Sequence, residues 1–463
     1  MHYYVIGVLT VSWALWLWDT YLDYRQYRVV KKTESVPDIL KDQIGDETFK
    51  KAKSYSIDKA RFGFVTSAYS QIQFTLTICL FLMPYFWQLS HQIMTGTFGL
   101  SRSDSIEWEI FQSLVFTFIT SIVSTLVNLP VSIYNTFFLE QKHGFNKQTP
   151  AFYAWDKLKK FLISFSISAP VLSGVVYIVR KGGDYFFLYL WLFCFVVVLV
   201  LTFFHGEIAA LFDKFTPLPA GELRDRIEKL AEDVNFPLSN IFVVEGSKRS
   251  THSNAYQSGM FSKKRIVIYD TLIADYYKKK EANEKKQQSD DGTSNKDVTK
   301  EKEASGNDKK KGCSDDEIIA VLCHEIGHWY HMHLFKYLMF AETNYLFIFI
   351  IFSKLYNDVA LYSAFGFYRE QPVVIGLALL MMILTPYLEI LGFVSTLMSR
   401  KNEYQSDAYA MKRGHAEQLK TALVKLNIDN LGFPVHDELY STFNHSHPTL
   451  IQRIKALERS KTD

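Results

Sequence analysis

Two histidines four residues apart enclose a glutamate in the run H-E-I-G-H, from His324 to His328. On a helix, positions i and i+4 lie on one face, so both imidazoles can bind the same metal ion. Glu325, beside the first histidine, can then accept a proton from a water molecule that the metal activates and pass it to a leaving amine. Chance produces this pattern only about 0.02 times in a chain of this length and composition. The spacing therefore predicts a zinc site for peptide hydrolysis rather than two unrelated surface or core histidines.

A catalytic zinc ion needs a third protein ligand and a fourth position that stays open for water. The best candidate is Glu403, in the run S-R-K-N-E-Y-Q-S-D over residues 399–407. Asp407 follows it at i+4 on the same helix face, where it can hold a ligand histidine through the second N–H of the ring. We interpret His331 and His333, just after the motif, as packing or solvent-facing residues, because the third ligand normally comes from another segment.

Sequence signals around the motif indicate the elements that position it. Ser314 followed by Glu317 is the capping-box pattern, which predicts that a helix starts there and runs through the motif. Apolar residues at helical spacing predict another helix over residues 223–235. The runs 241–244 and 265–269 are rich in β-branched and aromatic residues, so we expect them to pair as a hairpin beside the site.

The segment 278–312, directly before the motif, differs in composition from its neighbours. It consists of charged and small polar residues, with Val298 as its only large apolar residue. Such a segment cannot bury enough apolar surface to offset the entropy of ordering. We therefore expect a disordered insertion that acts as a solvated linker.

The overall composition points away from nucleic acid and toward a lipid bilayer. The chain has 463 residues, with 51 Lys and Arg against 48 Asp and Glu, so its formal charge is only +3 and no strongly basic field is present. Hydrophobic residues make up 48% and aromatic residues 16%, and the charged residues are concentrated in a few stretches. Long stretches without charge are typical of membrane-spanning helices, which need roughly 20 mainly apolar residues. Seven segments meet this criterion: 3–22, 65–87, 110–131, 161–179, 185–205, 334–355 and 373–393.

Basic residues are distributed unevenly between the loops that join these spans. The loops 23–61 and 132–160 are rich in Lys and Arg, which predicts that they are cytosolic and that the N-terminus is luminal. The same count places 206–333 and 394–463 together on the cytosolic side. We therefore expect four parts: spans one to five with their two cytosolic loops (1–205), a catalytic segment with the histidine motif (206–333), spans six and seven (334–393), and a catalytic segment with the third ligand (394–463).

Together, these motifs give the chain a resemblance to the integral-membrane zinc CAAX prenyl proteases of type 1. E-Q-K-H-G-F-N-K-Q-T over 140–149 is similar to the family's loop between the third and fourth spans, and E-G-S-K-R-S-T-H-S-N-A-Y over 245–256 is similar to its segment beside the catalytic cleft. The H-E-I-G-H run, the Glu403 segment, and His447-Pro448-Thr449 followed by Arg453 complete the set in the family's order. The resemblance covers nearly the whole chain, and the insertion 278–312 is its main departure.

The resemblance implies a fold and a cellular location. The expected fold is an all-α multi-pass membrane protein whose seven transmembrane helices enclose a chamber, closed by a mostly helical zinc metalloprotease domain with a small β-hairpin or sheet. One zinc ion per chain is implied. The implied location is the endoplasmic reticulum membrane and the inner nuclear membrane, with the catalytic segments and C-terminus facing cytosol or nucleoplasm. The oligomeric state is not indicated.

The resemblance also implies substrates and roles for individual residues. The implied substrates are prenylated proteins ending in C-a-a-X, from which the aaX tripeptide is removed, with a second upstream cut in farnesylated precursors such as prelamin A. His324, His328 and Glu403 would bind zinc, Glu325 would act as general base, and His447 would stabilise the oxyanion. Asn254, near a predicted edge strand, would hydrogen-bond the substrate backbone, and Asp407 and Arg453 would orient the ligands.

Three other functions are compatible with parts of the pattern. A membrane quality-control metalloprotease would share the zinc site but cut misfolded or translocon-clogging proteins. An intramembrane protease would carry H-E-x-x-H inside an apolar helix, whereas here the motif follows a charged segment. A multi-pass transporter or scaffold without catalytic activity would leave the motif unexplained.

Overall fold

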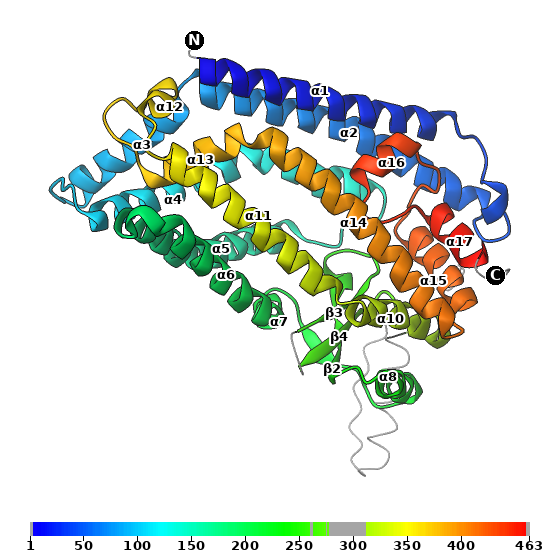
Figure 1. Cartoon of the computed structure of the whole chain (residues 1–463). Coiled ribbons are helices and arrows are strands. Elements are labelled where there is room, and N and C mark those ends of the chain that lie inside the picture. Colours follow the sequence, from blue (N-terminus) through cyan, green and yellow to red (C-terminus); the bar gives the residue numbers. More distant parts are fainter. Residues whose placement is uncertain (1–2, 260–262, 275, 277–311, 460–463) are drawn as a thin grey trace.

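The largest part of the molecule is a closed cycle of long apolar helices, each packed against the next (Figure 1). The computed structural model describes residues 3–259, 263–274, 276 and 312–459. Many large apolar side chains of these helices are exposed, as contact with lipid requires. Around the cycle lie α1 (Tyr3–Lys32), α2 (Asp46–Cys79), α3 (Leu82–Gln92), α4 (Ile106–Ile133), α5 (Pro150–Lys181), α6 (Phe186–Phe203), α11 (His333–Leu355), α13 (Val373–Ile383) and α14 (Thr385–Lys412), which packs against α1 again.

Five of the predicted spans are single helices that are long and apolar enough to cross a membrane. The two predicted at 65–87 and 373–393 are bent pairs, with 66° between α2 and α3 and 65° between α13 and α14. Phe81 adopts a left-handed conformation at the first break, and Pro386 lies in the first turn of α14, where its missing N–H costs nothing. Counted as one span each, the pairs bring the total to seven. The ring of membrane helices and the predicted fold class are thus confirmed.

A four-stranded sheet lies beside the histidine motif, and its topology corrects one expectation. The strands 241–244 and 265–269 were expected to form a hairpin, which is wrong, because Ile241 pairs with Ile266 in a parallel register. The chain between these strands supplies the crossover that a parallel pair requires, and within its described part Ala255–Ser258 pair antiparallel with the second strand. The order is β1 (Phe215–Pro217), β2 (Leu238–Val244), β4 (Lys264–Tyr269) and β3 (Ala255–Ser258), so β3 is the edge strand nearest the motif.

One hydrophobic core joins the two polar segments that flank the sixth and seventh spans. Ile268 of the sheet, Leu322 of the motif helix and Leu419 near the C-terminus are almost fully buried in it.

The expected helix over 223–235 is present, and the expected insertion 278–312 lies outside the described residues apart from Gly312. The remaining helices are α7 (His205–Ala210), α8 (Glu222–Asp233), α10 (Asp315–Tyr330), α12 (Val359–Ala364), α15 (Ala416–Asp429), α16 (Glu438–Asn444) and α17 (Leu450–Arg459), with short 3-10 or π turns η1 (Asp38–Leu40), η2 (Ile93–Thr97), η3 (Tyr134–Glu140), η4 (Gly183–Tyr185) and η5 (Gly246–Lys248).

An arginine connects the sheet to the membrane ring. The Arg249 guanidinium, just after η5, forms ion pairs of 2.8 Å with Asp156 of α5 and 2.7 Å with Asp213 before β1. It also donates to the main-chain oxygen of Phe212 and lies 5.3 Å from the ring centroid of Phe152. Since Arg249 and Asp156 are largely shielded from water, their contact fixes the sheet against α5.

Replacing Arg249 with alanine should lower the free energy of unfolding by about 1–3 kcal/mol, because two carboxylates would lose the cation that they share. The measurement is the melting temperature of detergent-solubilised protein, followed by tryptophan fluorescence. Arg224→Ala is the matched control, since Arg224 forms an exposed pair with Glu228 within α8 and should change stability by less than about 0.5 kcal/mol. Equal melting temperatures for the two variants would contradict the role of this contact.

Candidate active site

Helix α10 presents the histidine motif, and its packing explains the glycine inside that motif. The predicted capping box is present: the main-chain N–H of Ser314 donates to Glu317 at 2.7 Å, and the N–H of Glu317 donates to the Ser314 hydroxyl at 3.4 Å. At Gly327, a Cβ atom would lie 3.1 Å from Cα of Ser406 and 3.2 Å from Cβ of Tyr409, both on α14. A side chain at this position would push α14 away, so glycine allows the close approach that brings the two helices together at the site.

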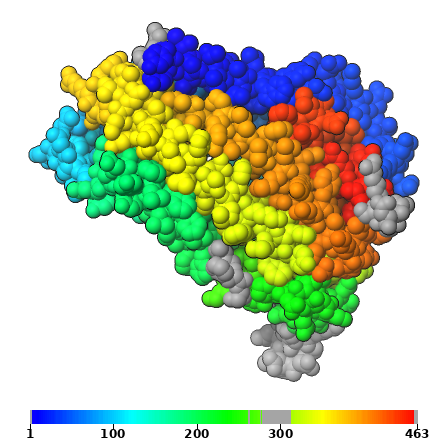
Figure 2. Space-filling view, in the orientation of Figure 1, coloured from blue at the N-terminus to red at the C-terminus, as the bar shows by residue number. Residues whose placement is uncertain are grey.

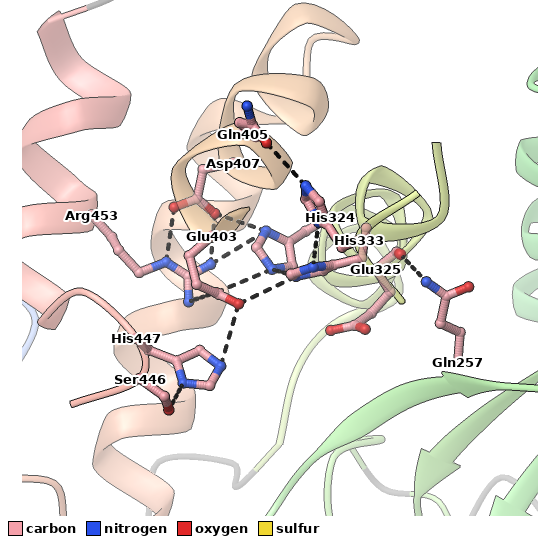
Figure 3. Close-up of polar contacts among 11 residues, drawn as sticks. Gln257, His324, Glu325, His333, Glu403, Gln405, Asp407, Ser446, His447 and Arg453 are labelled. Carbon is pink, nitrogen blue, oxygen red and sulfur yellow. Dashed lines mark hydrogen bonds and ion pairs between the residues drawn. The ribbon is translucent and has the colours of Figure 1, made fainter. Parts of the chain in front are cut away.

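This approach places three ligand atoms in one group (Figure 3). The Nε2 atoms of His324 and His328 lie 3.2 Å apart, and Glu403 of α14 lies 3.5 Å from the first and 3.3 Å from the second. Among the described residues, His324, His328 and Glu403 are the one set of at least three His, Cys, Asp or Glu side chains grouped closely enough to hold a metal ion. The structure therefore brings together the three residues that the sequence predicted as metal ligands.

Asp407 and Arg453 support one of these histidines from behind. The Asp407 carboxylate accepts the Nδ1–H of His324 at 2.8 Å, which leaves the Nε2 lone pair of His324 facing the ligand group. Arg453 of α17 binds Asp407 through two hydrogen bonds of 2.8 and 2.6 Å and lies 3.5 Å from Glu403. Arg453 thus contacts Glu403, as expected, but its main partner is Asp407.

A second chain of hydrogen bonds supports the other histidine. His333, at the start of α11, lies with its Nδ1 2.9 Å from Nδ1 of His328 and its Nε2 3.0 Å from the amide oxygen of Gln405. An amide oxygen only accepts, so Nε2 of His333 carries the proton and its Nδ1 accepts from His328. The Nε2 lone pair of His328 then also faces the ligand group. Each ligand histidine is thus held in the tautomer that binds a metal.

Two further observations indicate that the group fits a metal ion. Two nitrogens bound to one tetrahedral zinc ion would lie about 3.3 Å apart, close to the separation of the two Nε2 atoms. Oε2 of Glu403 is buried and accepts no hydrogen bond from the described residues. Burial lowers the pKa of His324, but the neighbouring carboxylates of Asp407 and Glu403 outweigh this and raise the pKa to about 9. The surroundings therefore favour positive charge at the position where a cation would bind.

The remaining predicted residues line the same region. Glu325 is half-buried beside the histidine pair, and burial raises the pKa of its carboxyl above the usual range. His447 is exposed, with its Nε2 3.3 Å from Glu403 (Figure 3). Asn254 is exposed at the start of edge strand β3. Asn254, His447 and Arg453 share a cavity of about 710 Å³ that opens next to the ligand group.

Sequence reasoning missed three contacts around the site. His333 was interpreted as a packing or solvent-facing residue, whereas it is buried and bonded to a ligand histidine. It points back to the site because Met332 adopts a left-handed conformation that ends α10 and starts α11. Gln405 completes this chain, and Gln257 of β3 donates to the main-chain oxygen of Glu325 at 2.7 Å. No spacing rule links His333, Gln405 and Gln257 to the motif. The available signal was His333 itself, a histidine five residues after His328.

Replacing Glu403 with glutamine should remove most of the bound metal, because the amide keeps the volume but loses the negative charge that binds a dication. The measurement is the metal content of purified protein by mass spectrometry. Glu389→Gln on the same helix should keep the wild-type content, since Glu389 is exposed outside the ligand group. Wild-type metal content in Glu403→Gln would exclude Glu403 as a ligand.

Replacing His333 with alanine should weaken metal affinity by about 10- to 100-fold, because His328 would lose the acceptor that fixes its tautomer. His333→Asn should recover part of the loss, since its amide oxygen can accept the same proton. Competition with a chromophoric chelator measures both variants, and His331→Ala, outside this chain of hydrogen bonds, is the control. A wild-type affinity in His333→Ala would show that the contact does not act on the metal site.

Comparisons with known proteins agree with this geometry. Residues 26–214 match the family model described as CAAX prenyl protease N-terminal, five membrane helices, and residues 217–461 match Peptidase family M48. The chain is 44% identical to the CAAX prenyl protease 1 homolog of Mus musculus, over 99% of this chain and 96% of the relative. It is 37% identical to CAAX prenyl protease 1 of Saccharomyces cerevisiae, over 96% and 93%. The crystal structure of S. mikatae Ste24p superposes with a TM-score of 0.83 at 36% identity, covering 99% of both chains. The chain is therefore a multi-pass membrane metallopeptidase that belongs to the M48 family of CAAX prenyl proteases.

Proposed function

We propose that this protein is a zinc-dependent endopeptidase that removes the aaX tripeptide from prenylated CAAX proteins. The observation that carries the proposal is the match, over nearly the whole chain, to relatives named CAAX prenyl protease 1. The architecture supports it, because the ligand group lies where the membrane ring meets the polar domain, which is formed by the sheet, α8, α10, α15 and α17 around one core. A substrate with a lipid in the bilayer and a peptide in water needs a protease at that boundary.

The ligand set supports zinc as the metal and suggests a role for each residue. Two imidazoles and one carboxylate are the donor set of several hydrolytic zinc sites, with a fourth position open. Bound zinc would lower the pKa of a water molecule and polarise the scissile carbonyl. Glu325 accepts a proton from this water as its oxygen attacks the carbonyl carbon, and then delivers the proton to the amine nitrogen as the C–N bond breaks.

Other residues of the site stabilise charge and position the substrate. His447, exposed 3.3 Å from Glu403, donates its Nε2–H to the oxyanion that develops on the carbonyl oxygen. Asn254 precedes β3, the edge strand, and the substrate backbone lies along this edge as an added strand. The side-chain amide of Gln257 donates to the main-chain oxygen of Glu325 and so holds β3 against α10. This contact fixes the position of the edge strand relative to the catalytic base.

The proposed location is the endoplasmic reticulum membrane and the inner nuclear membrane, with the site facing cytosol or nucleoplasm. Contacts between polar segments support this topology. Arg25 of α1, in the basic segment 23–61 that the sequence predicted as a loop, pairs with Asp437 at 3.0 Å. Asn146, in the segment 132–160, forms a β-bridge with Ser250. These segments therefore lie on one side of the ring, and their positive charge favours the cytosolic side. A second upstream cut in farnesylated precursors such as prelamin A is part of the same proposal.

Purified protein should cleave a farnesylated C-a-a-X peptide before the aaX tripeptide. A chelator should stop the reaction, and Glu325→Ala should slow it strongly. Loss of the general base should reduce kcat by about 10²–10⁴-fold while metal content stays at the wild-type level. Chromatography with mass spectrometry of the released tripeptide measures the rate and the cut site. Cleavage of unprenylated membrane proteins, with the prenylated peptide intact, would instead support the quality-control alternative.

A further inference from the structure

The cavity next to the ligand group has two chemically different walls. Its volume is about 710 Å³, and it shares His447 and Arg453 with the metal site, so it starts where a bound peptide would be cut. One wall is apolar and is formed by Leu423, Leu426 and Leu450. Apart from Pro448, the rest of the lining is polar or aromatic and consists of Tyr55, Lys59, His252, Ser253, Asn254, Tyr269, Asn427, Asn430, His447 and Arg453.

The charge of this cavity is positive. Its lining contains Lys59 and Arg453 but no Asp or Glu. Arg453 is buried and is engaged by Asp407 through two hydrogen bonds. Lys59 is different, because it is exposed and, in the part of the chain that the structure describes, no carboxylate lies within ion-pair distance of its ammonium group.

The position of Lys59 is nevertheless defined by its neighbours on α2 and η3. Its Nζ lies 5.1 Å from the ring centroid of Tyr55, one helical turn earlier. The hydroxyl of Tyr55 donates to Glu140 at 2.8 Å, which holds the ring beneath the ammonium group. Lys59 is thus a positioned cation in the lining of a cavity that also contains His447 and Arg453 of the metal site.

We propose that this cavity binds the three residues that the enzyme releases, and that Lys59 binds their C-terminal carboxylate. The inference rests on the proposed CAAX activity. Three extended residues span about 10 Å, and the last of them carries the free carboxylate that the cation recognises. The apolar wall of Leu423, Leu426 and Leu450 receives the aliphatic side chains of the tripeptide. For the release of the aaX tripeptide, Lys59 thereby sets the cut at three residues from the C-terminus, whereas the upstream cut does not use this contact.

The test compares two farnesylated peptides that differ only in a C-terminal carboxylate or carboxamide. Wild-type protein should cleave the acid with a kcat/KM roughly 10- to 100-fold above that of the amide, the range expected for one charge-assisted contact. Lys59→Ala should reduce kcat/KM for the acid to the level of the amide and leave the amide unchanged. Lys59→Arg should keep the preference for the acid, and Lys50→Ala, an exposed lysine of α2 outside the cavity, should behave as wild type.

Each outcome separates this inference from the proposed function. Failure of wild-type protein to cleave either peptide would contradict the CAAX activity itself. Equal cleavage of acid and amide by wild-type protein would keep that activity but overturn the carboxylate subsite. An equal loss on both peptides in Lys59→Ala would also overturn it, because a structural defect does not distinguish the two ends.

Discussion

The close approach of α10 and α14 is the constraint on which the rest of the site depends. Gly327 allows Ser406 to approach α10 closely, and at this separation Glu403 reaches both histidines. The approach has a cost, because it buries Asp407 and Glu403 together, away from water. Arg453 offsets one of these charges, and the cation favoured by the ligand group would offset the other. The helix packing that forms the site therefore also buries two carboxylates, and these need positive charge beside them.

The ligand group is supported by the ends of two membrane helices. Glu403 lies on α14, which begins in the membrane ring and continues into the polar domain. His333 is the first residue of α11, which forms another wall of the ring. Figure 2 shows the segments of α11 and α14 (yellow to orange) continuous on one face with those of the C-terminal helices. A shift of either membrane helix would therefore change the geometry of the metal ligands directly.

Two ion-pair contacts hold the polar domain to the ring. Arg249 binds α5, and Arg25 of α1 binds Asp437 before α16. The proposed carboxylate subsite also combines residues from both parts, since Lys59 lies on membrane helix α2 and Asn254 lies beside the sheet. A peptide in the cavity would therefore contact both parts of the molecule. The site, its supports and the proposed subsite all lie at this junction.

The sequence by itself determined the features that depend on local periodicity. Apolar runs of about 20 residues predicted the spans, and helical spacing predicted that His324 pairs with His328 and Glu403 with Asp407. The tertiary structure decided what depends on segments far apart in the chain. The parallel pairing of β2 with β4 follows from a crossover that no propensity encodes, and His333 reaches His328 only through the left-handed turn at Met332. Periodicity specifies which residues share one face of a helix or strand, but only tertiary packing decides which other segments contact that face.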